Sequence, residues 1–287
     1  NATATISLAN NSKVVVNNHN GMGLGQAANV LEGLGVMNIG ANSTFETPQG
    51  FVVTANGTMN VNGGNVIIAG KLTNNGTVVV TGTGNSQLDV KNYSGNAIQL
   101  NNGNLVDTYF AGRVDAFGTN NISGTTTIGG ILGLGYETNP TEQVVVNITG
   151  NFTGSNVLVR TNNSVDNILN VGKADGERTK VHFGQLGAFA DVNIVNTDVT
   201  YGYAFIRNDF NVTNSALAIN GGVNTYIAGN AKVVLDNTTW NLSGYANIGS
   251  YGGYMYGNAD VTLKNGSSMT ATNLGIEVNG EKVVKLT

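Results

Sequence analysis

Short runs in which every second residue is apolar recur along the chain, and each run follows an asparagine and a small residue. The pattern is Asn-(Gly/Ser/Thr)-x-apolar-x-apolar, and Asn75-Gly-Thr-Val78-Val-Val80 is one copy. Other copies begin at Asn11, Asn42, Asn56, Asn85, Asn196, Asn214 and Asn237. Alternation with a period of two is typical of a half-buried β-strand, and asparagine and glycine tolerate the left-handed backbone of tight turns. Each copy therefore predicts a turn followed by a short strand.

The spacing of the copies suits a stack of coils. The offsets between Asn196, Asn214 and Asn237 are 18 and then 23, and residues 230–237 resemble residues 258–265 at an offset of 28. One such strand cannot bury its apolar face alone, whereas copies stacked about 4.8 Å apart can. We therefore predict an all-β fold, a parallel β-helix or β-solenoid of short strands with Asn/Gly turns. A coil of about 20 residues would give some 14 coils, and polar asparagines at inward corners could stack in ladders.

This fold predicts which side chains form the core, and a β-sandwich is the alternative. The side chains expected to point inward are those of Val78, Val80, Leu88, Val199, Leu217 and Trp240. Irregular spacing and the lack of copies between Asn85 and Asn196 favour a sandwich. Sandwiches, however, usually protect their exposed edges with more proline and charge than the 2 Pro and 10% charged residues of this chain. We therefore favour a single solenoid domain over residues 1–287.

Two segments interrupt the alternating pattern. The segment 21–35 is a candidate irregular or capping segment, because residues 23–32 fit either a short helix over the first coil or an irregular first coil. Residues 173–180 hold five charges in eight positions, which predicts a solvated loop.

Composition narrows the function mainly by exclusion. The 287 residues include 46 Asn and 41 Gly, with 13 basic and 17 acidic residues and a net charge of −4. The 40% apolar content favours folding over disorder. The scarcity of basic residues argues against nucleic-acid binding, and no apolar run is long enough to span a bilayer, so we expect no membrane insertion. We interpret the chain, which starts at Asn1, as a processed, exported product and expect it at the cell surface or outside the cell.

Phrases such as NGTMNVNGGNVIIAGKLTNNGTVVVTGTG, residues 56–84, resemble the passenger regions of bacterial autotransporter adhesins. They also resemble other extracellular β-solenoids, including subunits of prokaryotic surface layers and sheaths. The resemblance covers most of the chain, lies in style rather than in a specific motif, and implies a parallel β-helix.

Two roles follow from the resemblance and the composition. The first is a non-enzymatic structural protein that self-assembles into a cell-surface sheath, surface layer or filament, since low charge leaves little repulsion between copies. The second is an adhesin passenger that binds host or sister-cell surfaces. The expected partners are copies of the chain itself, or cell-surface glycans and proteins.

Residues suited to catalysis or to metal and cofactor binding are scarce. His19 and His182, the only histidines, are interpreted as polar surface or turn residues, and the lack of cysteine makes a zinc site unexpected. Asp175, Glu177 and Arg178 are the nearest approach to an acid–base group, but they fall in the predicted loop. We therefore expect no catalytic, metal-binding or cofactor-binding residues and no enzymatic activity.

Two sets of residues are candidates for surface contacts or modification. The tripeptide Asn-x-Ser/Thr occurs 14 times, and the candidate glycosylation sites are Asn56, Asn75, Asn147, Asn151 and Asn211. The turn-to-strand pattern generates this tripeptide by itself, which is the simpler explanation.

Tyrosine is concentrated towards the C-terminus. Seven of the ten tyrosines lie between Tyr201 and Tyr256. Tyr251, Tyr254 and Tyr256, which lie among glycines, form a candidate contact loop, with a core or corner aromatic stack as the alternative.

Overall fold

A computed structural model describes residues 5–9, 11–15, 28–31, 35–135, 142–162, 165–219, 224–251, 255–278 and 281–287. These residues contain no helix; their parallel strands stack as a β-solenoid of about 10 turns, which confirms the predicted fold. The number of turns is below the expected 14 because several coils are longer than the expected length of about 20 residues. Thr5, for example, pairs with Val36, which lies 31 residues further along the chain. The chain divides into two compact units, Asn1–Leu132 and Gly133–Thr287, and the single-domain assignment stays a prediction.

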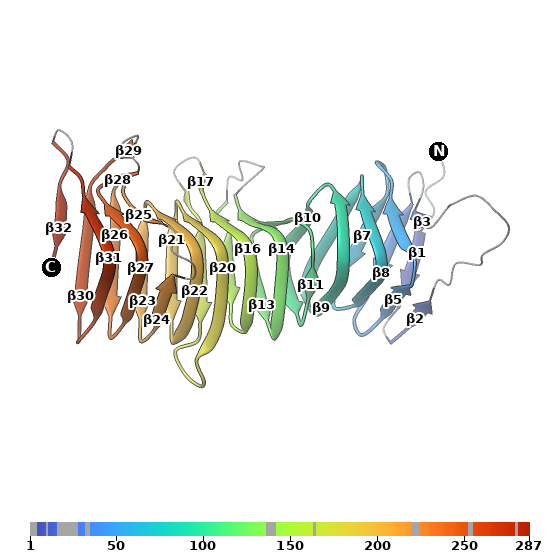
Figure 1. Cartoon of the computed structure of the whole chain (residues 1–287). Helices are drawn as coiled ribbons and strands as arrows, with labels where there is room; N and C mark the ends of the chain where they lie inside the picture. Colours follow the sequence, from blue (N-terminus) through green and yellow to red (C-terminus); the bar gives the residue numbers. More distant parts are fainter. Residues whose placement is uncertain are drawn as a thin grey trace. The chain divides into compact units, whose positions relative to one another are not determined.

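The first unit is built from short parallel strands that stack on one another in successive coils (Figure 1). The strands are β1 (Thr5–Leu8), β2 (Lys13–Val15), β3 (Ala28–Leu31), β4 (Val36–Ile39), β5 (Thr44–Thr47), β6 (Gly50–Val53), β7 (Thr58–Val61), β8 (Asn65–Asn74), β9 (Thr77–Gly95), β10 (Ile98–Val106), β11 (Tyr109–Phe110), β12 (Val114–Phe117), β13 (Thr119–Ser123) and β14 (Thr125–Leu134), whose last two residues belong to the second unit.

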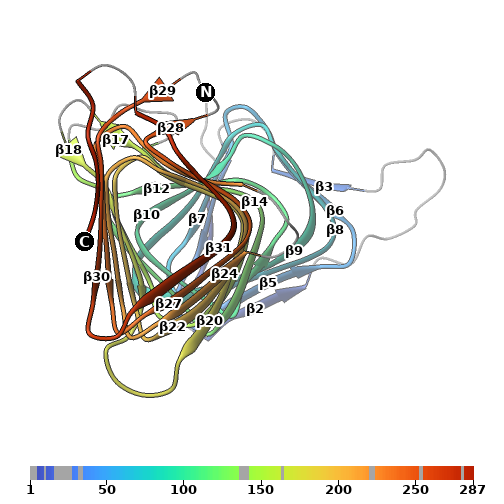
Figure 2. The same ribbon diagram turned by 60° about the vertical axis from the view of Figure 1, so that its left-hand side comes forward.

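The second unit repeats this architecture and adds two small antiparallel hairpins. Its strands are β15 (Val145–Ile148), β16 (Asn151–Val159), β17 (Thr161–Asn162), β18 (Val165–Asp166), β19 (Ile168–Gly172), β20 (Thr179–Ala188), β21 (Asp191–Val195), β22 (Thr197–Ile206), β23 (Asp209–Thr213), β24 (Ala216–Ile219), β25 (Thr225–Ile227), β26 (Ala231–Asp236), β27 (Thr239–Ile248), β28 (Ser250–Tyr251), β29 (Met255–Tyr256), β30 (Ala259–Lys264), β31 (Ser268–Ile276) and β32 (Val284–Leu286). The hairpins β17–β18 and β28–β29 emerge on the same side of this unit (Figure 2).

The segment 21–35 departs from one of the two expected forms. Residues 28–31 form strand β3, which pairs in parallel with β6, so a helix over residues 23–32 is wrong for these four residues. The rest of that segment, apart from Gly35, lies outside the described residues.

The predicted core positions are buried. Val78, Val80, Leu88, Val199, Leu217 and Trp240 are each at most 2% exposed, whereas Val79 is half-buried. Because side chains alternate across a strand, the outward position of Val79 follows from the inward positions on both sides. The predicted alternation is therefore confirmed.

The spacing of the coils follows the spacing of the sequence pattern. Val192 pairs with Phe210, and Phe210 pairs with Val233, at the same offsets of 18 and then 23 that separate the asparagines. Val233 then pairs with Val261 at the offset of 28 found in the sequence. In the following strand Trp240 pairs with Met269, so an additional residue is accommodated at the corner between β30 and β31.

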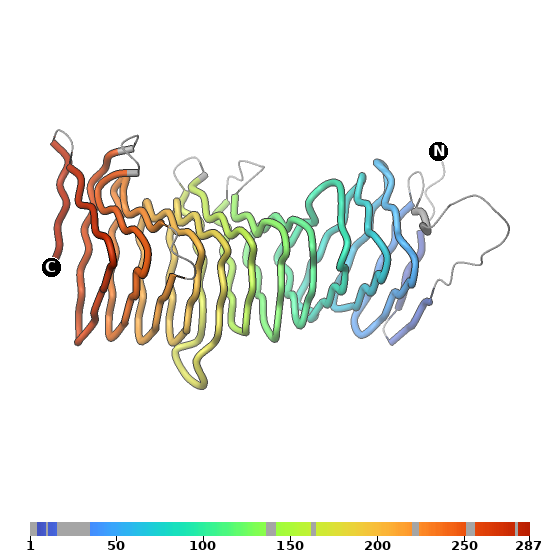
Figure 3. The backbone as a smooth tube through the Cα atoms, viewed as in Figure 1, coloured from blue at the N-terminus to red at the C-terminus, as the bar shows by residue number. Residues whose placement is uncertain are grey.

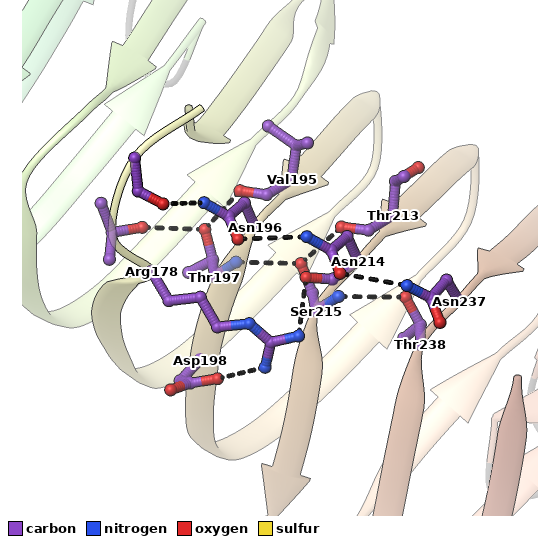
Figure 4. A network of polar contacts seen from close by, with 12 residues as sticks. Arg178, Val195, Asn196, Thr197, Asp198, Thr213, Asn214, Ser215, Asn237 and Thr238 are labelled. Carbon is purple, nitrogen blue, oxygen red and sulfur yellow. Dashed lines mark hydrogen bonds and ion pairs between the residues drawn. The ribbon is translucent and has the colours of Figure 1, made fainter. Parts of the chain in front are cut away.

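Asparagines at one corner of the second unit form a hydrogen-bonded ladder (Figure 4). Asn196, Asn214 and Asn237 all adopt left-handed conformations with φ of 48–49°. Nδ2 of Asn214 donates to Oδ1 of Asn196 at 3.2 Å, and Nδ2 of Asn237 donates to Oδ1 of Asn214 at 3.1 Å. The tolerance of asparagine for this conformation thus places each carboxamide against the next coil.

The residue after each of these asparagines supplies an inward hydroxyl. The Thr197 N–H donates to Oγ of Ser215 at 3.0 Å, and the Ser215 N–H donates to Oγ1 of Thr238 at 3.4 Å. The expected ladder of asparagines exists. Beside it, the hydroxyls of Thr197, Ser215 and Thr238 are almost fully buried, where they satisfy backbone groups that would otherwise lack partners.

A buried hydrogen-bond network crosses the core of the second unit. The hydroxyl of Tyr201 accepts from Nε1 of Trp240 at 2.7 Å and lies 3.0 Å from Oγ1 of Thr225. Trp240 also stacks on Phe210, with ring centroids 5.8 Å apart. Burial raises the pKa of the Tyr201 hydroxyl well above its ordinary value, so the group stays neutral.

Replacement of Tyr201 by Phe should destabilise the second unit by about 1–3 kcal/mol, because the indole N–H of Trp240 loses its acceptor in the core. The midpoint of urea unfolding measures this change. Tyr256→Phe, at a side chain that is 37% exposed, serves as the matched control and should be nearly neutral. Equal midpoints for the two variants would contradict the role assigned to the network.

Candidate functional site

Residues 173–178 of the charged segment form a projecting, exposed loop, and Thr179 and Lys180 are the first residues of β20 (Figure 3). Asp175 and Glu177 are exposed, whereas the guanidinium of Arg178 forms an ion pair with Asp198 at 2.8 Å and donates to the carbonyl of Asn214. The prediction of a solvated loop is confirmed for residues 173–178 and is wrong for Thr179 and Lys180, which begin β20. Arg178 holds this loop against the asparagine corner.

The two histidines and the acidic residues add no recognisable site. His19 lies outside the described residues, and half-exposed His182 on β20 has Nδ1 2.9 Å from Oγ1 of Thr200, as predicted for a surface histidine. Across the described ranges, no group of three or more His, Cys, Asp or Glu is placed to hold a metal ion. In the same ranges, no helix has the length and apolar character needed to cross a membrane.

The candidate glycosylation asparagines fall into two groups. Asn56, Asn75 and Asn151 are exposed, and Oδ1 of Asn151 accepts from the Lys180 N–H at 3.0 Å. Asn147 and Asn211 are instead members of a second, outward-facing ladder.

This second ladder links four successive coils of the second unit. Nδ2 of Asn170 donates to Asn147 at 2.9 Å, Nδ2 of Asn193 to Asn170 at 3.0 Å, and Nδ2 of Asn211 to Asn193 at 3.0 Å. Glycosylation of Asn211 would replace a hydrogen on the nitrogen that donates to Asn193. The three exposed sites are therefore the better candidates, and their glycosylation stays a prediction.

The candidate tyrosine loop is only partly described. Tyr251 lies in β28, which pairs with β29, and Tyr256 in β29 is 37% exposed. Tyr254 lies outside the described residues. Two of the remaining tyrosines, Tyr203 and Tyr226, belong instead to an aromatic cluster on the outer surface of the coils.

The outer cluster consists of Tyr203 and Phe205 on β22, Tyr226 on β25, and Phe189, which directly follows β20. The strand register aligns Gly187, Phe205 and Tyr226 on outward positions of β20, β22 and β25. Phe205 and Tyr226 are only 7% and 9% exposed despite facing outward, because they pack against neighbouring rings. Tyr203 packs on Tyr226 with centroids 5.8 Å apart, and Phe189 packs edge-on against Phe205 at 5.4 Å.

A pocket of about 300 Å³ opens beside this cluster and is lined by Arg160, Thr161, Phe189 and Arg207. We call it the arginine pocket. Val159 pairs with Ala188, and Ala188 pairs with Ile206, so the residues that follow them occupy equivalent positions on three successive coils. Arg160, Phe189 and Arg207 therefore occupy a row of positions along the stack, with Phe189 in the middle.

Arg207 is held in place by aromatic rings. Its guanidinium carbon lies 5.9 Å from the ring centroid of Phe189 and 6.0 Å from that of Phe205, within the range of cation–π attraction. Among the described residues, no carboxylate forms an ion pair with Arg207. A fixed and uncompensated guanidinium beside an open pocket is suited to binding an anionic group.

Three carboxylates lie close to one another in this unit: Asp166 ends β18, Asp191 begins β21 and Asp209 begins β23. Burial raises the pKa of Asp191, and the nearby charges of Asp166 and Asp209 raise it further. Oδ1 of Asp191 accepts from Nδ2 of Asn208 at 2.9 Å. These acidic groups do not line the pocket, but they oppose general attraction of anions to this side of the unit.

The chain matches no family model, no curated protein and no solved structure.

The sequence interpretation did not identify the pocket residues. A signal was present, since Val157-Leu-Val-Arg160 and Ala204-Phe-Ile-Arg207 both end an apolar run with arginine. The unequal lengths of the coils concealed it, because the coil from Arg160 to Phe189 is much longer than the coil from Phe189 to Arg207.

Proposed function

We propose that this chain is a non-enzymatic structural protein of the cell surface that self-assembles into a sheath, surface layer or filament. The observation that supports it is the state of the edge strands. Across the described ranges, 11 large apolar side chains are exposed, and eight of them lie in the first two strands or from β31 onward. These eight are Ile6, Val14, Val15, Leu274, Ile276, Val278, Val283 and Leu286.

Several of these exposed side chains have the inward register of the core. In the first unit, Ile6 pairs with buried Met37 yet is 50% exposed. In the second unit, Leu274 and Ile276 pair with buried Ala246 and Ile248 but are 47% and 50% exposed. They are core residues over which, in the part of the chain that the structure describes, no further coil is stacked.

The occupant that fits such an edge is a coil of a second copy. Among the described strands, β1, β2, β31 and β32 each pair along one edge only, so their outer N–H and C=O groups are available to another strand. These side chains are about half exposed, so covering each would contribute about half of the ~1.5–3 kcal/mol of a full burial. The eight together then reach the range of the association cost, about 4–15 kcal/mol. Addition of a parallel strand would continue the existing stack.

A non-catalytic role agrees with the placement of the charged residues. Arg178 is engaged in holding its loop, and Asp175 and Glu177 point into solvent beside it. An acid–base pair needs two titratable groups that converge on one substrate, and an exposed loop corner does not provide this.

Purified chain should polymerise, and proline at the edge strands should prevent it. The Thr44 N–H donates to the carbonyl of Ser12, so alternation turns the N–H of Val15 towards the open edge of β2. The Ala259 N–H donates to the carbonyl of Val283, which likewise turns the N–H of Val284 outward. Val15→Pro and Val284→Pro therefore remove donors from open edges while keeping the internal ladders.

Sedimentation velocity and electron microscopy test this proposal. We expect ordered polymers of the wild-type chain and a shift to monomers in the two proline variants, with unchanged thermal unfolding. Ala174→Pro, in the exposed loop, is the control and should still polymerise. A wild-type chain that stays monomeric at high concentration, or polymers unaffected by both edge prolines, would contradict the proposal.

A second function, that of an adhesin passenger, is favoured by one observation. The outer aromatic cluster and the arginine pocket give the second unit a surface that combines rings with guanidinium groups. Surfaces of this composition are typical of binding sites, because aromatic residues provide contact area at small entropic cost. The corresponding partners are cell-surface glycans or proteins.

A further inference from the structure

We propose that the arginine pocket binds an anionic saccharide unit, through the carboxylate of a uronic acid or a sulfate ester on a sugar ring. The proposal rests on the adhesin function and specifies its ligand class. It does not depend on self-assembly.

The charge arrangement points to an anion. Arg160 and Arg207 occupy equivalent positions two coils apart, about 10 Å along the stack, with Phe189 between them. Guanidinium groups bind carboxylate and sulfate oxygens through paired, charge-assisted hydrogen bonds. Because Arg207 packs against the adjoining rings of Phe189 and Phe205, less conformational entropy is lost when it binds.

The aromatic surroundings point to a sugar rather than to a small inorganic ion. Half-buried Phe189 presents part of its ring to the pocket, and a volume of about 300 Å³ is at the lower limit of small-molecule sites. Further along the same outward face, Tyr203 is half-buried and Tyr245 is 36% exposed. Rings on successive coils offer apolar faces for the C–H groups of successive sugars, and their hydroxyls offer hydrogen bonds.

Because the chain carries a net negative charge, non-specific adsorption of polyanions to its surface is unfavourable. The chain has a net charge of −4, and Asp191 and Asp209 each come two residues after a pocket residue, Phe189 and Arg207 respectively. An anionic saccharide therefore has to be held by short-range contacts with Arg160 and Arg207. We expect a defined stoichiometry of one saccharide per chain.

Isothermal titration calorimetry of the full 287-residue chain tests the inference with three trisaccharides of the same linkage. These are trigalacturonic acid, neutral galactotriose and galactotriose carrying a sulfate ester. We expect one or both anionic trisaccharides to bind at least 10-fold more tightly than the neutral one. Binding of trigalacturonic acid alone would identify the anion as a carboxylate, binding of the sulfated trisaccharide alone would identify it as a sulfate, and binding of both would show that the pocket accepts either.

The variants Arg207→Met and Arg160→Met retain side-chain length while removing the charge, and each should weaken binding at least 10-fold. Arg160 is exposed, so its variant keeps the test valid if loss of Arg207 disturbs the aromatic cluster. Arg178→Met, in the loop at residues 173–178, is the matched control and should leave affinity unchanged. Unaltered affinity in both pocket variants would overturn the proposal.

The wild-type results also separate this inference from the proposed functions. Equal binding of all three trisaccharides would overturn the anionic site while leaving a glycan adhesin intact. Absence of binding to all three would overturn the site and count against the adhesin function. Polymer formation, followed separately by sedimentation, reports on the structural function alone.

Discussion

Replacement of Val78 by Lys should destabilise the first unit by about 3–5 kcal/mol, the cost typical of a buried charge without a partner. Val78 is 1% exposed and pairs with Met59, which is fully buried. A lysine ammonium at this position would lie among stacked apolar side chains with no carboxylate in register. We expect a large fall in the midpoint of urea unfolding and loss of amide protection in β7 and β9.

Val79→Lys is the matched control for this prediction. Val79 is half-buried, pairs with Asn60 on one side and with Gln99 on the other, and faces outward. Lysine can extend from there into solvent, so the change should stay within about 0.5 kcal/mol. Equal destabilisation by both substitutions would show that the alternation assigned to β9 is wrong.

Replacement of Gly172 by Ala should destabilise the second unit by about 3–5 kcal/mol, combining backbone strain with overpacking. Gly172 ends β19 with φ of 92°, a conformation that L side chains rarely adopt. A β-carbon there would clash with the carbonyl oxygen of Val195 and the hydroxyl of Thr197, both on the next coil. Neither group can move easily, because Thr197 is buried and hydrogen-bonded to Ser215.

Gly176→Ala separates the two contributions. Gly176 has a similar φ of 89°, but no heavy atom lies within 4 Å of the position that its β-carbon would occupy. This substitution should therefore cost only the conformational strain, about 1–2 kcal/mol. Thermal unfolding of the two variants measures the difference, and a loss for Gly176→Ala as large as that for Gly172→Ala would rule out the clash as the main cause.

The amino-acid sequence by itself determined the fold class and the orientation of the strands' side chains. Alternation identified Val78, Leu88 and Trp240 as inward residues, and all three are buried. The left-handed corner asparagines, such as Asn196 and Asn214, could also be anticipated. These features depend on residues that are close in the chain, since the two-residue period of a strand and the backbone preference of asparagine are local properties.

The strands between Asn85 and Asn196 were harder to anticipate. No copy of the asparagine pattern occurs there, yet strands continue through this segment. Left-handed positions in this segment are taken by Asn102 and also by Asp107, Gly118 and Gly172. Several residue types can supply the same turn conformation, so a pattern based on asparagine alone misses part of the repeat.

Tertiary structure alone decided which outward residues become neighbours. Coils of unequal length bring together Arg160, Phe189 and Arg207, and they align Asn147 with Asn170 in a ladder. The same stacking makes outward Phe205 nearly inaccessible, against the simple expectation for an outward position. Strand alternation specifies only whether a side chain points in or out, whereas contacts between coils depend on how many residues each corner inserts before the next strand begins.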